Sequence, residues 1–278
     1  MLPDLFRIPF VGWRIHSFGV LVVLGFLAGY WFVRQATARD GIPREKIQDL
    51  PIWMVLSGLI GARLFYVVQF YDESFRGADW HHAFRIWEGG LVFYGGLILA
   101  APVFVIYCRR HGLPLLSMLD AMAPATALGL GFGRIGCFLN GCCYGRECAA
   151  DFPLGVRYPA DSLPMAGREA GAWLHPTQLY ESLLAFAMAL LLWAIWRRRV
   201  APGAVLAALF LLYGTGRFLL EGIRGDHGVP LGGWTVSRWI SLATATIGAA
   251  IGLALAARIG ARESAPADSR PPLAGAQP

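Results

Sequence analysis

Long apolar runs dominate this chain and constrain its fold more than any other feature. Each run offers about 17 to 25 mainly apolar residues, the length that an α-helix needs to cross about 30 Å of hydrocarbon. The sequence of 278 residues is 56% hydrophobic and only 15% charged. A soluble domain of this length cannot bury so much apolar surface. The sequence therefore predicts an all-α polytopic membrane protein.

Seven runs meet this length criterion and define the predicted helices. They are residues 16–34, 51–71, 90–108, 118–138, 176–196, 203–221 and 236–257. The fourth run is the least apolar, because Asp120, several glycines and Arg134 interrupt it. The alternative for that run is a re-entrant segment. The first run lacks a small-residue cleavage site, so we expect it to be retained rather than removed as a signal peptide.

Basic residues follow every odd-numbered run and predict the orientation in the membrane. The clusters comprise Arg34, Arg39, Arg44 and Lys46 after the first run, Arg109 and Arg110 after the third, Arg197 to Arg199 after the fifth, and Arg258 and Arg262 after the seventh. Because Lys and Arg favour the cytoplasmic side, we expect the N-terminus outside and the C-terminus in the cytoplasm. The net charge of +6 is spread over short loops, which favours anionic lipid over nucleic acid as the partner.

The predicted domain organisation is simple. We expect residues 1–262 to form one integral membrane catalytic domain with extracytoplasmic loops at about 72–88 and 141–175. The second loop is long enough for a small lobe or a lid. Residues 263–278 are rich in Pro, Ala and Ser, which predicts a disordered cytoplasmic tail.

Three arginines lie at the predicted outer ends of runs, namely Arg63, Arg134 and Arg217. A guanidinium at membrane depth requires an anionic partner. Each could instead snorkel to an interface or pair with a nearby carboxylate, for which the candidates are Glu88, Glu181 and Glu221. Arg217 and Arg224 share one helical face with Glu221. Three such arginines together favour a site for an anionic ligand.

Two further polar motifs border the runs. The segment from Glu88 to Gly96 contains two glycine pairs, which would let a backbone or a lipid headgroup approach closely. Such pairs are also ordinary helix-packing devices in membranes. The segment from His175 to Glu181 opens the fifth run, where His, Gln and Tyr side chains can face a headgroup. A lone histidine at this position is more often a satisfied interfacial residue than a base.

Four of the five cysteines lie within twelve residues, at Cys137, Cys142, Cys143 and Cys148. Their spacing matches no common zinc or iron–sulfur pattern, and adjacent cysteines chelate one ion poorly, so we predict no metal site. Alternatives are a disulfide from Cys148 to Cys142 or Cys143, if the loop is extracytoplasmic, and a nucleophilic thiol whose pKa Arg134 lowers. We expect Cys108 to serve in packing.

Four motifs in sequence resemble the bacterial prolipoprotein diacylglyceryl transferases. They are Gly133-Arg-x-Gly-x-Phe-x-Asn140 followed by Gly145, Phe93-x-Gly-Gly, His175-Pro-x-Gln-Leu-Tyr-Glu181 and Arg217-x3-Glu221-x2-Arg224. The resemblance runs from about His16 to Ile251. It implies a multi-pass enzyme of the bacterial plasma (inner) membrane. That enzyme would move the diacylglyceryl group of phosphatidylglycerol onto the lipobox cysteine of a prolipoprotein and release glycerol phosphate, without a metal or organic cofactor.

The resemblance also implies roles for particular residues. Thiolate attack on the glyceryl carbon expels a phosphate monoester, so the phosphate must be held in line and its departing oxygen stabilised. Arg134 and Arg217 match the family's essential arginines and would do both, oriented by Glu221 and Arg224. The expected phospholipid-binding residues are Arg63, Arg134, Asn140, Gly145, Gln178, Tyr180, Arg217, Glu221, Arg224, Gly95 and Gly96.

This chain departs from the better-known form of the motifs at several positions. Cys137 stands where many members have Asn, Cys142 where many have Glu, Phe18 where some have Tyr, and Tyr94 where some have His, a proposed general base. A tyrosine, with an ordinary pKa near about 10, is a poor base at neutral pH. Either His175 is the base, or Tyr94 only hydrogen-bonds the lipid.

Two other functional classes stay open at the level of sequence. A non-catalytic phospholipid-binding or lipid-moving membrane protein would keep the arginines and would not need thiol activation. A redox protein would use the clustered cysteines and could tolerate the loss of Arg217.

Overall fold

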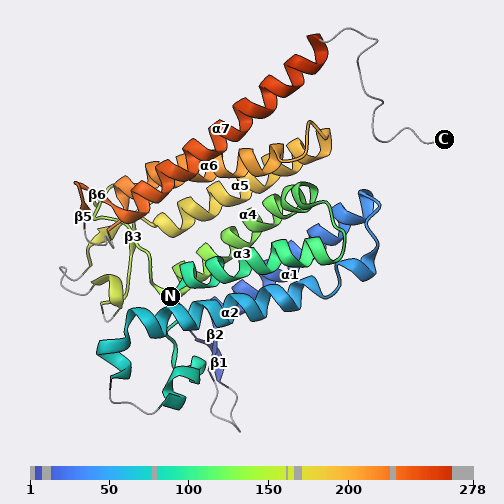
Figure 1. Ribbon diagram of the computed structural model, residues 1–278. Helices are drawn as coiled ribbons and strands as arrows, with labels where there is room; N and C mark the ends of the chain where they lie inside the picture. The colour runs from blue at the N-terminus through green and yellow to red at the C-terminus, as the bar shows by residue number, and fades with distance from the viewer. Residues whose placement is uncertain are drawn as a thin grey trace. The chain divides into compact units, whose positions relative to one another are not determined.

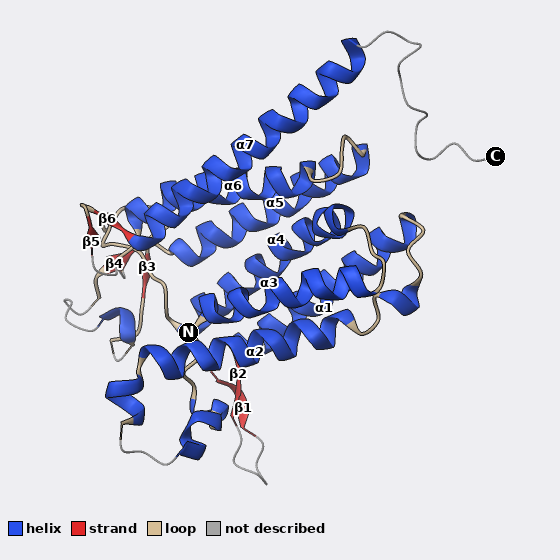
Figure 2. Ribbon diagram, in the orientation of Figure 1, coloured by secondary structure: helices blue, strands red, loops and turns tan. Residues whose placement is uncertain are grey.

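Helices account for most of the chain in the computed structural model (Figures 1 and 2). The structure describes residues 4–7, 14–76, 80–160, 162–165, 171–225 and 230–264. The chain divides into two compact units. The larger unit comprises Met1–Phe32 and Leu119–Pro278, and the smaller unit comprises Val33–Met118. Each unit is described by itself below.

Seven long helices occupy the seven predicted runs. They are α1 (Ser17–Arg39), α2 (Leu50–Gln69), α3 (Phe93–Arg110), α4 (Leu115–Asn140), α5 (Thr177–Arg198), α6 (Ala204–Leu220) and α7 (Val236–Ser264). All seven are long and apolar enough to cross a membrane. The predicted all-α membrane fold is therefore confirmed. The continuous 26 residues of α4 favour a full span over the re-entrant alternative.

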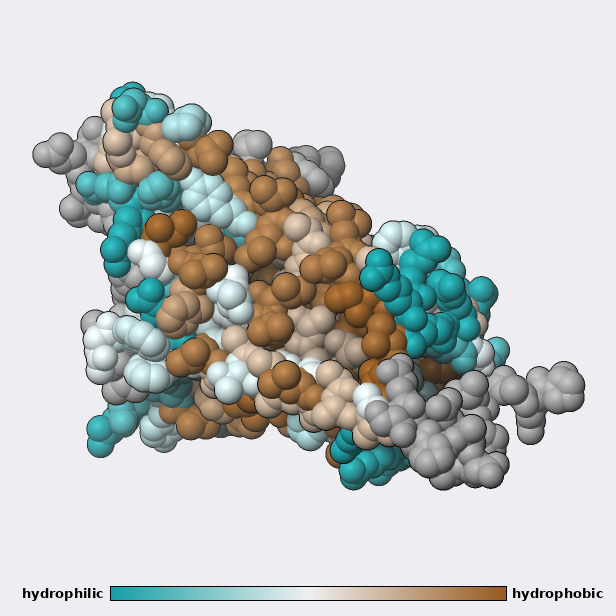
Figure 3. All heavy atoms as spheres, turned by 90° about the horizontal axis from the view of Figure 1, so that it is seen from above, coloured by the Kyte–Doolittle hydropathy of each residue, from teal (hydrophilic) through white to brown (hydrophobic). Residues whose placement is uncertain are grey.

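Apolar side chains cover the outside of these helices. Leu183 and Leu253 are each more than 70% exposed, and Figure 3 shows much of the surface in the brown of hydrophobic residues. A water-soluble protein rarely exposes so much apolar surface. The chain is therefore built to present its hydrophobic side chains to lipid.

In the smaller unit, α2 and α3 pack through glycines. A Cβ atom at Gly61 would overlap the carbonyl of Gly95, and one at Gly96 would lie 2.8 Å from the carbonyl oxygen of Gly58. Without side chains at these points, the two backbones approach closely. The close approach that Gly95 and Gly96 permit is thus that of α2.

In the larger unit, a buried carboxylate caps the N-terminus of α6. Asp120 of α4 accepts hydrogen bonds from the backbone N–H of Gly203 at 2.6 Å and of Leu206 at 2.9 Å. These donors have no partner within the helix, and a carboxylate also matches the positive end of the helix dipole. Asp120 therefore ties α4 to α6. It is not a mere interruption of an apolar run.

Short strands and turns fold the connections. Within the described residues, the strands form three antiparallel pairs, β1 (Asp4–Arg7) with β2 (Arg14–His16), β3 (Val156–Arg157) with β4 (Trp173–Leu174), and β5 (Pro230–Leu231) with β6 (Trp234–Thr235). Tyr158, Met165 and Leu174 make a small core under Phe138. Part of the predicted loop 141–175 thus has a core of its own. Helix α7 includes the first two residues of the predicted tail, and the rest of that tail lies outside the described residues.

Candidate functional site

Three segments that are distant in sequence meet beside the ends of α4, α5 and α6. The N–H of Gly145 donates to the carbonyl of His175 at 3.0 Å, and the N–H of Arg146 donates to the carbonyl of Ile223 at 2.9 Å. A Cβ atom at Gly145 would lie 2.6 Å from the His175 oxygen, so this crossing requires glycine. These hydrogen bonds hold the ends of the three helices close to one another.

A cluster of three arginines and two glutamates lies next to this crossing. Glu181 of α5 forms ion pairs with Arg134 of α4, with Arg217 of α6 at 2.8 Å and with Arg224 at 3.2 Å. Glu221 lies 2.8 Å from Arg217 and 3.8 Å from Arg224. We call these five residues the arginine cluster. They come from three helices and the turn after α6.

The arginine cluster is buried and carries a net charge of +1. Its arginine side chains are 10 to 16% exposed, and its glutamates are 5 and 6% exposed. Thr235 donates a hydrogen bond of 2.7 Å to Glu221, and Ser182 donates one of 3.0 Å to the carbonyl of Gly131, which ties α5 to α4. A buried cation in excess attracts an anion strongly, because the surroundings screen its charge poorly.

An apolar hollow between α4, α5 and α6 includes two residues of the arginine cluster. Its lining consists of Leu130, Leu184, Ala185, Met188, Tyr213 and Leu220 together with Glu181 and Arg217. The exposed lining of this hollow is entirely apolar, and its space is no larger than one water molecule needs. It is therefore a packing gap beside the arginine cluster.

The other predicted ligands of the larger unit mainly support the loop after α4. Gln178 is fully buried, donates to the carbonyl of Cys142 at 2.7 Å and accepts from the Tyr158 hydroxyl at 3.3 Å. Tyr180 lies 3.4 Å from Nδ1 of His175. Asn140 ends α4 with an exposed side chain.

The predicted site residues of the smaller unit make contacts within that unit. Arg63 donates hydrogen bonds to the backbone carbonyls of His82, Ala83, Gly89 and Gly90 at 2.7 to 3.0 Å. Its guanidinium therefore organises the loop before α3. Tyr94, in the first turn of α3, is 46% exposed.

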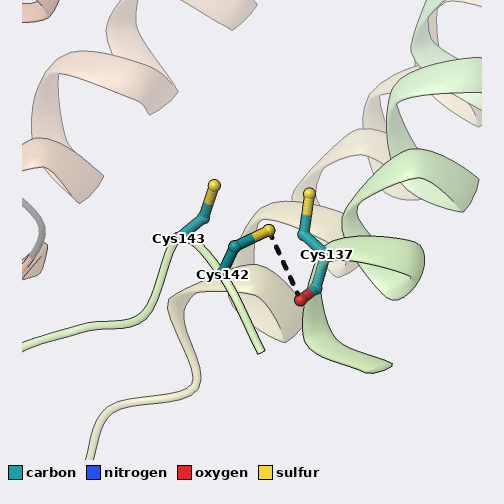
Figure 4. Close-up of side chains that lie close together, drawn as sticks. All are labelled: Cys137, Cys142 and Cys143. Carbon is teal, nitrogen blue, oxygen red and sulfur yellow. Dashed lines mark hydrogen bonds between the residues drawn. The ribbon is translucent and has the colours of Figure 1, made fainter. Parts of the chain in front are cut away.

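The end of α4 brings three cysteines together. Gly141, with φ +77°, follows the last helical residue. The N–H of Gly141 donates to Phe138 at 3.2 Å, and the N–H of Cys142 donates to Cys137 at 3.1 Å. This glycine-terminated helix end folds the chain back, so that the side chain of the second residue after the helix meets the one near its last turn. Figure 4 shows Cys142 beside Cys137 for this reason.

Cys143 completes the group through an unusual backbone conformation. Its φ of +63° lies in the left-handed region that non-glycine residues rarely adopt. The sulfur atoms of Cys137, Cys142 and Cys143 all lie within 4.8 Å of one another (Figure 4). The spacing of the cysteines in sequence did not indicate this convergence, which the turn at Gly141 and the backbone conformation of Cys143 produce.

All five cysteines are free thiols, so the structure does not form the alternative disulfide from Cys148. Hydrogen bonds from the Cys137 and Cys142 thiols, together with the charges of Arg134 and Arg224, lower the pKa of Cys143 against the opposing effect of burial. Burial raises the pKa of Cys148 instead. The thiol of Cys143 is therefore chemically distinct from that of Cys148.

Comparison with known proteins identifies the family. The family described as prolipoprotein diacylglyceryl transferase matches residues 3–254. The chain belongs to the prolipoprotein diacylglyceryl transferase family. A protein of Gloeobacter violaceus named phosphatidylglycerol–prolipoprotein diacylglyceryl transferase is 34% identical over 257 residues, covering 92% of this chain and 93% of that protein. Proteins with the same name from Clostridium tetani and Geobacter sulfurreducens are 33% and 35% identical, covering 89% and 80% of this chain and 95% and 82% of their own lengths.

The resemblance that the four motifs indicated is thus confirmed for the family. In this diacylglyceryl transferase family member, three of the motifs lie in the larger unit. Arg134, Glu181 and Arg217 come from those three motifs, and they meet in the arginine cluster. Sequence reasoning missed that Glu181 is the centre of the cluster, because helix packing alone decides which helices share a carboxylate.

Proposed function

We propose that this protein transfers the diacylglyceryl group of phosphatidylglycerol to the lipobox cysteine of a prolipoprotein, the first step of bacterial lipoprotein maturation. The observation that carries this proposal is the buried arginine cluster, with its net charge of +1, in a chain of this family. The names of the relatives supply the substrates, and the cluster has the chemistry to handle one of them.

The arginine cluster would bind the lipid phosphate and stabilise the leaving group. The thiolate sulfur of the acceptor attacks the glyceryl carbon, the bond from that carbon to the phosphate oxygen breaks, and glycerol phosphate departs with the electron pair. Arg134 and Arg217 would donate to the phosphate oxygens, whose charge grows as the bond breaks. Glu181 and Glu221 would keep the guanidinium groups in place. Removing one such donor typically reduces kcat by about 10² to 10³.

The acyl chains of the lipid would lie between the spans, against exposed apolar side chains of the helices such as Leu183 and Leu184 of α5. We propose that the acceptor arrives with its own signal helix in the membrane. We also propose that the protein resides in the bacterial inner membrane with its N-terminus outside and its C-terminus in the cytoplasm, as the basic clusters suggest.

The remaining residues would act mainly through the scaffold. We assign Arg63, Gly95 and Gly96 to the packing and loop structure of the smaller unit, because their close contacts are there. Gln178 and Gly145 would fix the loop after α4. His175, with Tyr180 beside it, is the candidate proton acceptor of the larger unit, and Tyr94 belongs to the smaller unit.

The test uses the purified full chain, phosphatidylglycerol and a lipobox peptide, with mass spectrometry of the peptide. We expect a diacylglyceryl thioether on the cysteine peptide and none on its serine counterpart. Arg134→Ala and Arg217→Ala should lose at least about 100-fold in rate. The matched control is Arg157→Ala, because Arg157 stacks on Trp173 at 4.6 Å outside the arginine cluster. Tight lipid binding without any thioether from folded protein would contradict the proposal and favour the lipid-moving alternative.

A further inference from the structure

The proposed reaction assigns no role to the three-cysteine group, whose geometry suits a metal ion. Cys137, Cys142 and Cys143 place three sulfur atoms within 4.8 Å of one another. Around a zinc ion, thiolates at about 2.3 Å form a tetrahedron whose edges measure about 3.8 Å. Each sulfur separation therefore needs to contract by at most about 1 Å, which a change of side-chain rotamer supplies.

Neighbouring side chains fix the backbone of Cys142 and Cys143 in place. Cys143 keeps a left-handed φ of +63°, a conformation that persists only where the surrounding structure enforces it. The carbonyl of Cys143 accepts a hydrogen bond of 2.8 Å from the buried Thr177 hydroxyl, and the carbonyl of Cys142 accepts one of 2.7 Å from the buried Gln178. These hydrogen bonds fix the backbones of Cys142 and Cys143, as the residues that surround metal ligands do at metal sites.

The group also lies beside the arginine cluster. Cys137 follows Arg134 by three residues on α4, so both side chains share one helical face. Arg134 interacts electrostatically with Cys143 and Cys137. A reactant bound at the three sulfurs would therefore lie close to the guanidinium that we assign to the lipid phosphate.

We propose that Cys137, Cys142 and Cys143 bind one zinc ion, whose fourth position takes the thiol of the acceptor cysteine. Three protein ligands with one open position are typical of catalytic zinc. A thiol that coordinates zinc loses its proton, which here passes to water. The bound thiolate then attacks the glyceryl carbon and forms the thioether, and the phosphate oxygen leaves with the electron pair.

This inference rests on the proposed function, and it resolves one difficulty of that function. Tyr94 is a poor base, and the proposed function otherwise relies on His175 to accept the proton of the thiol. Coordination to zinc removes the need for a side-chain base. Cysteine at positions 137 and 142 then supplies ligands where many family members carry Asn and Glu.

The first test measures binding without activity. The purified full chain is reduced, freed of metal with a chelator and titrated with cobalt(II) alone. We expect one cobalt per chain with an intense thiolate-to-cobalt charge-transfer band, which zinc displaces. The Cys143→Ser and Cys137→Ser variants should each lose the band, and the matched control Cys148→Ser should keep it. No band from reduced wild-type protein, or an unchanged band in Cys143→Ser, overturns the site.

The second test measures the role of the ion. A lipobox peptide should change the cobalt spectrum when it carries cysteine and leave it unchanged when it carries serine. Zinc should raise the thioether-forming rate of metal-free protein at least tenfold. An equal rate without metal overturns this inference and leaves the proposed function intact. Cobalt binding with no transfer under any condition instead contradicts the proposed function and the zinc-bound acceptor together. A disulfide among the three cysteines in protein from native membranes also overturns the site.

Discussion

Replacing Glu181 with glutamine should destabilise the protein and reduce its activity, because this side chain is shared by three buried arginines. After this substitution, Arg217 and Arg224 still have Glu221 as a partner, at 2.8 and 3.8 Å. Arg134 is affected most, because its ion-pair partner among the described residues is Glu181. Removing one partner of a buried pair costs about 3 to 5 kcal/mol. Glutamine still accepts one hydrogen bond, so we expect about 3 kcal/mol.

The substitution also raises the net charge of the arginine cluster from +1 to +2. Phosphatidylglycerol should therefore raise the melting temperature of Glu181→Gln more than that of the wild type, because the lipid phosphate replaces the missing carboxylate. We expect a loss of about 100-fold in kcat/KM, since Arg134 is no longer held in position. The assays are thermal unfolding in detergent, with and without the lipid, and the thioether-forming rate.

The matched control is Glu73→Gln, which changes an exposed glutamate of the smaller unit. It should leave both the melting temperature and the activity at wild-type values. The reasoning is refuted if Glu181→Gln melts and reacts like the wild type. It is also refuted if a zwitterionic lipid stabilises the variant as well as phosphatidylglycerol does.

Three further substitutions test the scaffold. Asp120→Ala removes the carboxylate that starts α6 and should lower stability by about 0.5 to 2 kcal/mol, measured by thermal unfolding, while the folded fraction keeps its specific activity. Gly95→Ala should destabilise the α2–α3 pair, because its Cβ would overlap Phe65, whereas Gly58→Ala meets nothing within 4 Å and serves as the control in the same unfolding assay. Gly141→Ala forces a left-handed alanine at a cost of about 1 to 2 kcal/mol and should lower cobalt binding in the titration; unchanged binding would contradict the role of this turn.

The spans were predictable because the bilayer imposes a length and a composition on each helix. Asp120 shows the limit of that reasoning. In the sequence it interrupts an apolar run, and in the structure it hydrogen-bonds the first turn of another helix. No local pattern indicates which helix end a buried carboxylate will reach, because that depends on the packing of α4 against α6.

The sequence predicted which residues belong to the candidate site, but it did not predict which of them contact one another. Arg134, Arg217 and Arg224 stood out as charges at membrane depth, yet their shared contact with Glu181 required the fold. Arg63 stood out for the same reason and instead binds four backbone carbonyls. An arginine in an apolar run indicates that an acceptor exists and does not indicate whether that acceptor is a ligand or the backbone.

The proximity of Cys137, Cys142 and Cys143 was not predicted, although the sequence contains a signal for it. A glycine directly after a helix predicts a turn that brings the second following residue back toward the last helical turn. Asn140-Gly141 carries that signal, and it places Cys142 beside Cys137. Spacing alone treated the residues as if the chain were extended.

The most direct test of the central claim counts both products of one reaction. Thioether-linked peptide and released glycerol phosphate are quantified together for the wild type, Arg134→Ala and Arg217→Ala, with folding verified by thermal unfolding. We predict equal amounts of the two products in the wild type, and a joint loss of at least about 100-fold in each variant. Wild-type rates in either folded arginine variant, or lipid consumption without thioether, would contradict the account.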